Sequence, residues 1–392
     1  MAVDFPSSPT PGQVYTQAGA TWTWDGVKWV AQGTGTGVYL PLTGGTMTGD
    51  ITLKGDPSAP LHPVTYRMVS NPNDNRIING DMRIDQRNNG AAGTAAGYTV
   101  DRWQISGSLT GKLNWGRNYG SIAAFAPGFP YCFGCSAQST FTLAAGDFFR
   151  LGQPLEADMI SDFAWGKAGA QPVTLSFWAY SSLTGTFSGS ICNDTANRSY
   201  PFTYSIPAAN TWTKITLTIP GDTVGTWVTS GNNAGAILYF DLGTGAAYRG
   251  PANAWASTNY VGATGSVSVV TTTGAYFYVT GVKLEIGSVA TPFNRQSLAK
   301  SMADCQRYYQ KGQIAFQGYS IPGILPYAGQ AFPVQMRGGP TFVIVTNNSA
   351  NVGAVNYAPL APPGMGATLV GTNVAATGGY TLNVNYTADA EL

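Results

Sequence analysis

The chain has 392 residues, a net charge of +1, 44% hydrophobic residues and 10% charged residues. An ordinary globular protein carries about 25% charged residues, so long charged helices are excluded here. The length allows two or three domains with real cores, and no Lys/Arg cluster is present to attract nucleic acid or an anionic membrane. The 50 glycines and 12% aromatic residues, with short Val/Thr/Ile/Tyr runs between turn residues, predict an all-β chain.

The first residues, MAVDFPSSPTPG, contain neither a basic region nor an apolar region of the signal-peptide kind. No window approaches about 18 consecutive apolar residues. We therefore expect a chain that is made in the cytosol, is not exported by a signal peptide and does not insert into a membrane.

Residues 1–36 begin with a proline-rich extended stretch and continue as TWTWDGVKWV at Thr21–Val30. This run predicts a hairpin with a type I′ turn at Asp25-Gly26, and Trp22 and Trp24 on one face. A lone hairpin is marginal in water, so these rings and Trp29 need a partner. The partner is the protein's own downstream domain, another copy or another protein.

Residues 37–70 contain short alternating apolar runs separated by glycines. No strand here can bury both sides within one chain, so we expect burial by twofold or threefold association. His62, the single histidine, lies in this segment. No Ser/His/Asp or Cys/His set can be built around it, so we expect a structural or trimer-contact role.

Within residues 71–292, three runs alternate apolar and other residues: Val173–Tyr180, Thr211–Ile219 and Ala236–Leu242. One parity of each run is apolar and is expected to face the core. Rings and a carboxylate on the opposite parity form the candidate glycan-binding set, because flat rings stack on sugars and polar groups orient hydroxyls. Its members are Trp178, Tyr180, Trp212, Tyr239 and Asp241.

This prediction assumes that the three strands are adjacent in one sheet. The alternative is that loops or a neighbouring subunit cover the face and make the rings ordinary packing. A second candidate group, Trp227, Tyr248, Trp255 and Tyr260, lies in Gly/Asn/Thr-rich segments that we expect to be loops at one end of the sandwich.

Residues 274–293 contain the longest expected strand. Its even positions from Tyr276 to Ile286 are mostly apolar, whereas the odd positions change from Phe277 to Glu285. This pattern predicts a strand covered on one face throughout and on both near its start. We expect it to close the sandwich and to lead, past Phe293, into a helix.

The segment 293–312 contains the one clearly helical pattern. A stripe of residues at 4-3-4 spacing is formed by Leu298, Met302, Cys305 and Tyr309. A helix this short is not stable alone, so the stripe must be buried. Either it packs on its own sandwich, or three copies meet about a symmetry axis and the stripe forms the trimer interface.

Residues 313–392 are again β, with alternating runs between turns rich in Pro, Gly and Asn. They can form a small domain, and trimerisation would help it to fold. The loop-like segments Asn347–Gly353 and Leu360–Gly366 either form a contact surface at the end of the molecule or only connect strands.

The cysteines give no basis for a metal or a cofactor, and we expect neither. Cys132 and Cys135 have C-x-x-C spacing, but the other available ligands, Cys192, Cys305 and His62, are distant in sequence. The residues after Cys135 look like a strand, whereas a redox motif wants a helix. Reduced thiols are therefore expected.

Acidic residues are sparse, which weakens the case for a glycosidase. Asp81 with Asp85, Glu156 with Asp158, or Asp101 could pair, but a carboxylate dyad is recognised by separation in space. We expect no enzyme, and a glycan depolymerase is kept as an alternative.

Several segments resemble one family. LPLTGGTMTGDITLKGDPSAPLHPVTYRMV resembles the shaft repeat of tailed-bacteriophage fibres, and FPSSPTPGQVY with TWTWDGVKWV resembles the virion-attachment segment of the same proteins. RIINGDMRIDQRNNG, VTLSFWAYSSLTGTF, YVTGVKLEIGSVATPF and CQRYY are similar to phage tail proteins with a carbohydrate-binding-module-like sandwich. FPVQMRGGPTFVIV and NYTADAEL resemble the C-terminal β-domain of such fibres.

The expected fold is all-β: a jelly-roll-like β-sandwich plus a small C-terminal β-domain, joined by a short trimerising helix, with an extended N-terminal anchor and shaft. The expected segments are a virion-attachment segment (1–36), a shaft (37–70), a sandwich (71–292), a helix (293–312) and a β tip (313–392).

The resemblance implies a homotrimeric tail fibre or spike in the virion, assembled in the bacterial host cytoplasm. It implies attachment to other virion proteins, in a tail, baseplate or head socket, through the segment of Trp22, Trp24 and Trp29. It also implies adhesion to host surface polysaccharide. A purely structural or decorative fibre is the alternative.

Overall fold

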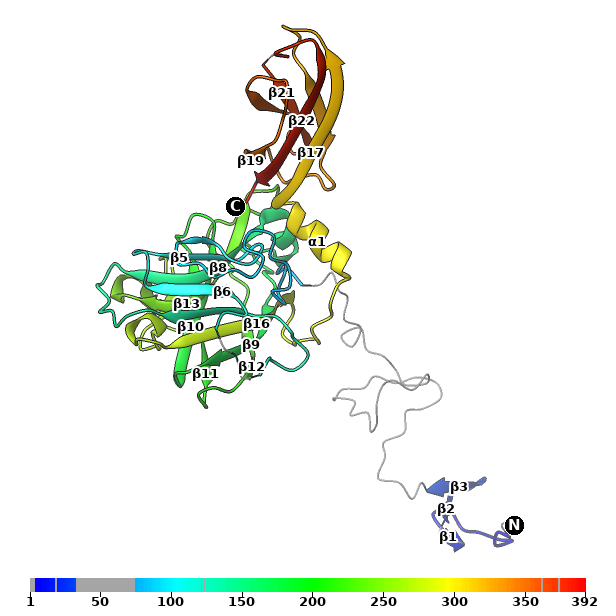
Figure 1. The fold of residues 1–392 in the computed structure, drawn as a ribbon. Coiled ribbons are helices and arrows are strands. Elements are labelled where there is room, and N and C mark those ends of the chain that lie inside the picture. The colour runs from blue at the N-terminus through cyan, green and yellow to red at the C-terminus, as the bar shows by residue number, and fades with distance from the viewer. Residues whose placement is uncertain are drawn as a thin grey trace. The chain divides into compact units, whose positions relative to one another are not determined.

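The computed structural model describes residues 4–17, 20–32, 75–120, 122, 124–360, 362–372 and 374–392 (Figure 1). The chain divides into two compact units, Met1–Val64 and Thr65–Leu392. The shaft predicted at 37–70, with His62, lies outside the described residues.

The first unit contains an antiparallel three-stranded sheet of β1 (Val14–Gln17), β2 (Ala20–Trp24) and β3 (Trp29–Gln32). The predicted hairpin is confirmed as β2–β3, but the two-residue turn is wrong, because Trp24 pairs with Trp29 across a four-residue connection. Asp25 Oδ1 accepts hydrogen bonds from the amides of Lys28 and Val27, each at 2.8 Å. These bonds stabilise the longer turn and lower the pKa of Asp25.

The three tryptophans of this sheet belong to one small aromatic cluster. Trp24 and Trp29 have ring centroids 5.6 Å apart. Phe5 stacks on Trp29 at 5.3 Å and meets Trp22 edge-on at 5.3 Å. The predicted shared face of Trp22 and Trp24 is confirmed by the β2–β3 register.

The second unit contains a sandwich of two antiparallel sheets (Figure 1). The six-stranded sheet has the order β11 (Ser199–Ile206), β10 (Gly185–Asn193), β13 (Ala234–Thr244), β8 (Phe148–Glu156), β5 (Gln104–Gly107) and β4 (Gly97–Tyr98). The five-stranded sheet has the order β12 (Thr213–Ile219), β9 (Val173–Ser181), β16 (Tyr276–Ile286), β7 (Phe133–Ala137) and β6 (Leu113–Arg117). Short elements between these strands are η2 (Ala157–Phe163), η3 (Ala246–Tyr248), η4 (Val269–Thr271) and the parallel pair β14 (Arg249–Gly250) and β15 (Gly262–Ala263).

The main core lies between the two sheets, and the predicted inward parities are confirmed there. Leu175 and Phe177 of β9 are at most 1% exposed, and so are Leu238 and Phe240 of β13. The rings of Phe177 and Phe240 meet edge-on with centroids 5.0 Å apart. The sandwich is thus closed by interdigitating side chains of both inner faces.

Strand β16 changes its inward face part-way along, which corrects the prediction of one apolar parity. Phe277 and Val279 face the core before residue 281, and Val282 and Leu284 face it afterwards. The register with β9 shifts between Thr280 and Lys283, and Gly281 adopts a φ of 63°. A left-handed glycine that inserts one extra residue is a β-bulge, and it moves every later side chain to the other face.

Helix α1 (Leu298–Gln306) begins at Ser297, whose side chain accepts a hydrogen bond from the amide of Lys300 at 3.2 Å. The helix is confirmed, but its predicted extension to Tyr309 is wrong. Tyr309 is the first residue of β17 (Tyr309–Ser320). Pairing with a long strand of the C-terminal domain ends the helix one turn early.

The predicted stripe is therefore divided between two environments. Cys305 is fully buried and Tyr309 is 7% exposed, whereas Leu298 is 60% exposed. Met302 is half-buried. The C-terminal part of the stripe packs on its own chain, and the N-terminal part remains accessible.

The C-terminal domain packs two three-stranded sheets around its own core. One has the order β17, β22 (Gly378–Asp389), β19 (Thr341–Asn347) and the other β18 (Tyr327–Ala331), β21 (Gly366–Gly371), β20 (Val355–Pro359). The core includes Ile314, Phe342, Leu369, Leu382 and Val384.

The last residues of the chain return to the sandwich. Arg102 forms a buried ion pair with Glu391. Arg87 reaches Asp389 at 2.7 Å and Glu391 at 3.1 Å. The hydroxyl of Tyr98 donates to the carbonyl of Leu392 at 3.0 Å. The end of β22 is thereby attached to the sandwich.

Candidate functional site

The outer face of the five-stranded sheet carries a cluster of aromatic rings. Its members are Tyr180 of β9, Tyr276 and Tyr278 of β16, and Trp212, which precedes β12. Tyr180 lies 5.3 Å from Trp212 and 6.1 Å, nearly parallel, from Tyr276. Tyr276 and Tyr278 are 5.5 Å apart. Rings from β9, from β16 and from the residue before β12 therefore lie together on this face.

The loop between β6 and β7 covers much of this cluster. Trp212 Nε1 donates to the carbonyl of Ala124 at 2.8 Å, and Thr280 Oγ1 donates to that of Tyr131 at 2.7 Å. Tyr180 is 5% exposed and Tyr278 is 3% exposed. These two rings are packed beneath the loop, so Tyr180 is not available for stacking with a ligand in this structure.

A second segment covers the other end of the same face. Lys283 and Glu285, which follow the bulge, form an ion pair at 3.0 Å. Glu285 also accepts a hydrogen bond from the amide of Thr291 at 2.8 Å. The chain after β16 therefore folds over this end of the sheet.

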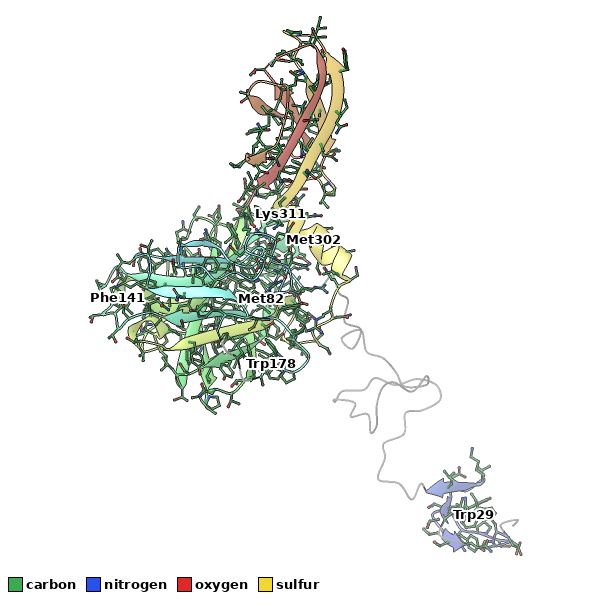
Figure 2. All side chains as sticks on the ribbon, viewed as in Figure 1. Trp29, Met82, Phe141, Trp178, Met302 and Lys311 are labelled. Atoms are coloured by element: carbon green, nitrogen blue, oxygen red, sulfur yellow. The ribbon has the colours of Figure 1, made fainter. Side chains whose placement is uncertain are left out.

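Between the two covers lies a part of the face that stays accessible. Trp178 is half-buried, and β12 places the exposed Lys214 directly opposite it. The exposed Thr216 follows on the same face of β12, opposite Ser176. Opposite residues on antiparallel strands have Cβ atoms about 5 Å apart, so these side chains are neighbours. We call Trp178, Lys214 and Thr216 the Trp178 surface; Figure 2 labels its tryptophan.

This surface combines the groups that a neutral sugar needs. The indole offers a flat apolar face, while the Lys214 ammonium and the Thr216 hydroxyl can bond to sugar hydroxyls. The arrangement favours binding of a saccharide rather than reaction with it.

The prediction that Tyr239 and Asp241 share a face with Trp178 is wrong, because β13 belongs to the six-stranded sheet. The Asp241 carboxylate is buried and accepts hydrogen bonds from the amide of Gly243 at 2.8 Å and from Ser188 Oγ at 3.0 Å. Burial raises the pKa of Asp241, and the Arg249 guanidinium 3.2 Å away opposes that rise.

Asp241 therefore ties chain segments together and cannot reach a ligand. Tyr239 is 9% exposed and lies beneath the guanidinium of Arg150, 4.0 Å from its ring centroid. Both residues lie on the outer face of their strand, as their parity predicts, but that face is covered.

The second candidate group also consists of packed rings. Trp227 meets Trp165 at 4.7 Å inside the main core, and the half-buried Trp255 packs against this core, 5.2 Å from Trp165. Trp227 Nε1 donates to Asp222 at 2.9 Å, and Trp255 Nε1 donates to the carbonyl of Pro220 at 2.9 Å.

The other two members of this group lie outside the tryptophan cluster. Tyr248 packs edge-on against Phe148 with ring centroids 5.6 Å apart. Tyr260 is half-buried, and its ring lies against Gly250.

Tyr276 and Tyr278 belong to the aromatic cluster, and the sequence prediction missed them because it assigned their parity to the core. Gly281 was the available signal, because a glycine within a strand often marks a bulge. The bulge puts Tyr276 and Tyr278 on the outer face, although their parity matches the buried Val282 and Leu284.

The carboxylates considered for a dyad each have partners of another kind. Asp81 pairs with Arg295 at 3.1 Å. Glu156 accepts two hydrogen bonds from Arg307, at 2.9 and 2.8 Å. Asp158 accepts from the amide of Gly231 at 2.6 Å.

Cys132 and Cys135 lie on opposite sides of the five-stranded sheet, in the outer aromatic cluster and in the main core. Burial raises the pKa of each thiol to about 12. In the described ranges, no group of three or more His, Cys, Asp or Glu side chains could hold a metal ion. Among the described residues, no helix is long and apolar enough to cross a membrane.

No protein-family model matches the chain, and no curated protein matches it. Among solved structures, it is similar to the enzymatically active domain of tailspike protein 4 of bacteriophage CBA120, with 15% identity and a TM-score of 0.29. That match covers 55% of this chain and 22% of the tailspike structure, so the chain spans about a fifth of that structure's length.

Two other solved structures are matched over their full length. A putative sugar binding protein from Bacteroides thetaiotaomicron is 12% identical over 54% of this chain and 100% of its own, with a TM-score of 0.32. A family 11 carbohydrate-binding module from Clostridium thermocellum, solved with a mixed-linked tetrasaccharide, is 10% identical over 51% and 100%, with a TM-score of 0.24.

Proposed function

We propose that the chain is the subunit of a homotrimeric phage tail fibre or spike, and that it binds glycans of the host surface through the Trp178 surface. The observation that carries the binding proposal is the half-buried Trp178 with the exposed Lys214 and Thr216 on the neighbouring strand. The two covering segments leave this part of the aromatic face accessible.

The other parts of the chain have supporting roles in this proposal. The N-terminal sheet, with its half-buried Trp22 and Trp24 and their neighbour Trp29, is the attachment to other virion proteins. The exposed Leu298 and half-buried Met302 contact other copies in the trimer. Three weak sites on one trimer gain avidity through their effective concentration, so no single site has to be tight.

We propose binding without catalysis, because the carboxylates that could form a dyad are held by arginines or by backbone amides. Incubation with host polysaccharide should therefore release no reducing sugar. If reducing sugar is released, and replacing one of these carboxylates abolishes the release, this part of the proposal is overturned.

The binding proposal is tested on the full-length protein with a panel of bacterial strains. Binding should be lost after periodate oxidation of surface sugars, and Trp178→Ala should weaken it about tenfold or more, which corresponds to about 1.4 kcal/mol. Trp178→Phe keeps a flat ring and should retain part of the binding. Leu109→Ala, which removes a 46% exposed apolar side chain between β5 and β6, outside the Trp178 surface, is the matched control.

If Trp178→Ala folds normally and binds like the unmodified protein, the Trp178 surface is not the site. That outcome would favour a structural fibre without glycan binding.

A further inference from the structure

A groove with a volume of about 680 Å³ lies beside α1, and the residues that line it do not include those of the Trp178 surface. Residues that line it include Arg83, Arg117, Tyr131, Arg295, Met302 and Lys311. They come from loops of the sandwich, from the end of β6, from α1 and from the first residues of β17, and Figure 2 shows Met302 and Lys311 at this junction. Ligand sites commonly measure about 300–1,000 Å³, so the groove has room for a short saccharide.

The groove carries more positive than negative charge. Its lining contains three arginines and Lys311 against two carboxylates, Asp81 and Asp85, which leaves a balance of +2. Asp81 is paired with Arg295 at 3.1 Å, and Asp85 accepts from the amide of Gly90 at 2.6 Å. Both carboxylates are therefore already satisfied within the chain.

Two of the cations retain capacity for a ligand. Lys311 is exposed, and within the described residues its ammonium takes part in no ion pair or side-chain hydrogen bond. Arg117 donates one hydrogen bond, from Nη1 to the carbonyl of Arg83 at 2.9 Å, and its Nε is 3.9 Å from the Asp85 carboxylate. A guanidinium has five N–H donors, so most of those of Arg117 remain available.

The groove also contains a flat ring. Tyr131 is 36% exposed, and the Arg117 guanidinium lies 5.1 Å from the centroid of its ring. Cation–π contact orients the ring and the guanidinium relative to each other. An exposed ring beside two incompletely paired cations suits a ligand that is part sugar and part anion.

We propose that this groove binds an acidic saccharide, a sugar ring that bears a carboxylate or a phosphate. The sugar ring lies on Tyr131, and Arg117 and Lys311 hold the anionic group. This inference rests on the proposed glycan adhesion and adds a second site of a different chemical class. A carboxylate and a phosphate satisfy the same donors, so both are included in the test.

The apolar side of the groove contains the exposed Leu298 and the half-buried Met302 of α1, which contact other copies in the proposed trimer. The competing hypothesis is that a second copy fills the whole groove, including its cationic side. The charges favour the saccharide. An interface built on this helix alone would have no need for cations without partners.

The test is titration calorimetry of the full-length protein with trigalacturonate, glucose 6-phosphate and the uncharged maltotriose, at low and high salt. At least one acidic ligand should bind more tightly than maltotriose, and its affinity should fall as salt rises. Lys311→Ala and Tyr131→Ala should each weaken that binding about tenfold. Lys167→Ala removes an exposed lysine outside the groove and should have no effect.

Binding of trigalacturonate alone would identify the anion as a carboxylate, and binding of glucose 6-phosphate alone as a phosphate; either supports the proposal. Trp178→Ala should leave this binding unchanged, so the two sites can fail independently. The proposal is overturned if neither acidic ligand binds better than maltotriose, or if Lys311→Ala binds like the unmodified protein. If Leu298→Ser lowers the mass of the oligomer in light scattering, and no acidic ligand binds to the unmodified protein, the whole groove is a contact between copies.

Discussion

Asp101 is a buried carboxyl at the point where the sandwich meets β17. It is 1% exposed and accepts a hydrogen bond from the amide of Gln86 at 2.8 Å. The side chain of Gln86 also donates to Asp101 and to the carbonyl of Tyr309. Burial raises the pKa of Asp101 to about 6, and the hydrogen bonds from Gln86 limit this rise.

A pKa of about 6, against 3.8 for a free aspartate side chain, means that the folded protein binds this proton more tightly than the unfolded chain. The stabilising contribution of the Asp101 proton to the free energy of unfolding is therefore fully present below pH 3.8 and is lost as pH rises through 6. Its size is about 3 kcal/mol. Between pH 4 and 7 the free energy of unfolding of the unmodified protein should fall by about this amount relative to that of Asp101→Asn, which has no titrating carboxyl at this position. Parallel pH profiles would contradict the prediction.

The ion pair of Arg102 and Glu391 is the most buried one between the sandwich and the C-terminal residues. Their side chains are 1% and 5% exposed. Glu391→Ala leaves a buried guanidinium without its carboxylate, so the free energy of unfolding should fall by about 3–5 kcal/mol.

Asp162→Ala is the matched control, because Asp162 is 52% exposed in its pair with Arg76. Its effect should be at most about 1 kcal/mol. Urea unfolding measures both variants, and equal effects would show that burial does not distinguish the two pairs.

At the scale of elements, the bulge at Gly281 decides which side chains of β16 form the outer aromatic cluster. A Cβ at Gly281 would lie 2.7 Å from the ring of Phe129, in a backbone with a φ of 63°. Gly281→Ala should therefore lower the free energy of unfolding by about 1–3 kcal/mol. Gly274→Ala is the control, since Gly274 has a φ of 74° but open space around it. An equal loss in both would exclude the contact with Phe129 as a cause.

The alternation of apolar and other residues along each run predicted the inward faces of β9, β12 and β13. It also identified Trp178 as a candidate glycan-binding residue. It could not predict that β9 and β12 pair with each other while β13 joins the opposite sheet, because strand pairing depends on contacts distant in sequence. Burial of Asp241 depends on Ser188 and Arg249, which no local pattern connects to it. The helix was predicted from its spacing, but its end at Gln306 depends on the pairing of β17 with β22.

At the scale of the whole molecule, the C-terminal domain has an unusual surface. From Gly312 to Ala388 the sequence contains one charged residue, Arg337, and this side chain donates to the carbonyls of Asn232 and Glu391. Large apolar side chains are nevertheless exposed, including Tyr319 at 76% and Tyr327 at 70%. Exposed apolar surface without repelling charge favours association.

This surface is consistent with the proposed trimer, which predicts that light scattering of the full-length protein gives three times the chain mass of 41.1 kDa. A charged substitution at an exposed apolar position, Tyr327→Glu, should shift the mass towards that of the single chain. A monomer mass for the unmodified protein at micromolar concentration would contradict the trimer.

The return of the last residues to the sandwich has a mechanical consequence. β17 and β22 pair from Tyr309 with Asp389 to Ser320 with Gly378. β17 follows α1 directly in the chain, and β22 is held at its last residue, Asp389, by Arg87 and just beyond its end, at Glu391, by Arg102. A pulling force on the far end of this domain is thus shared by two strands, each fastened to the sandwich, and loss of Glu391 would leave the pair of Arg87 and Asp389 as the ion pair that holds the end of β22.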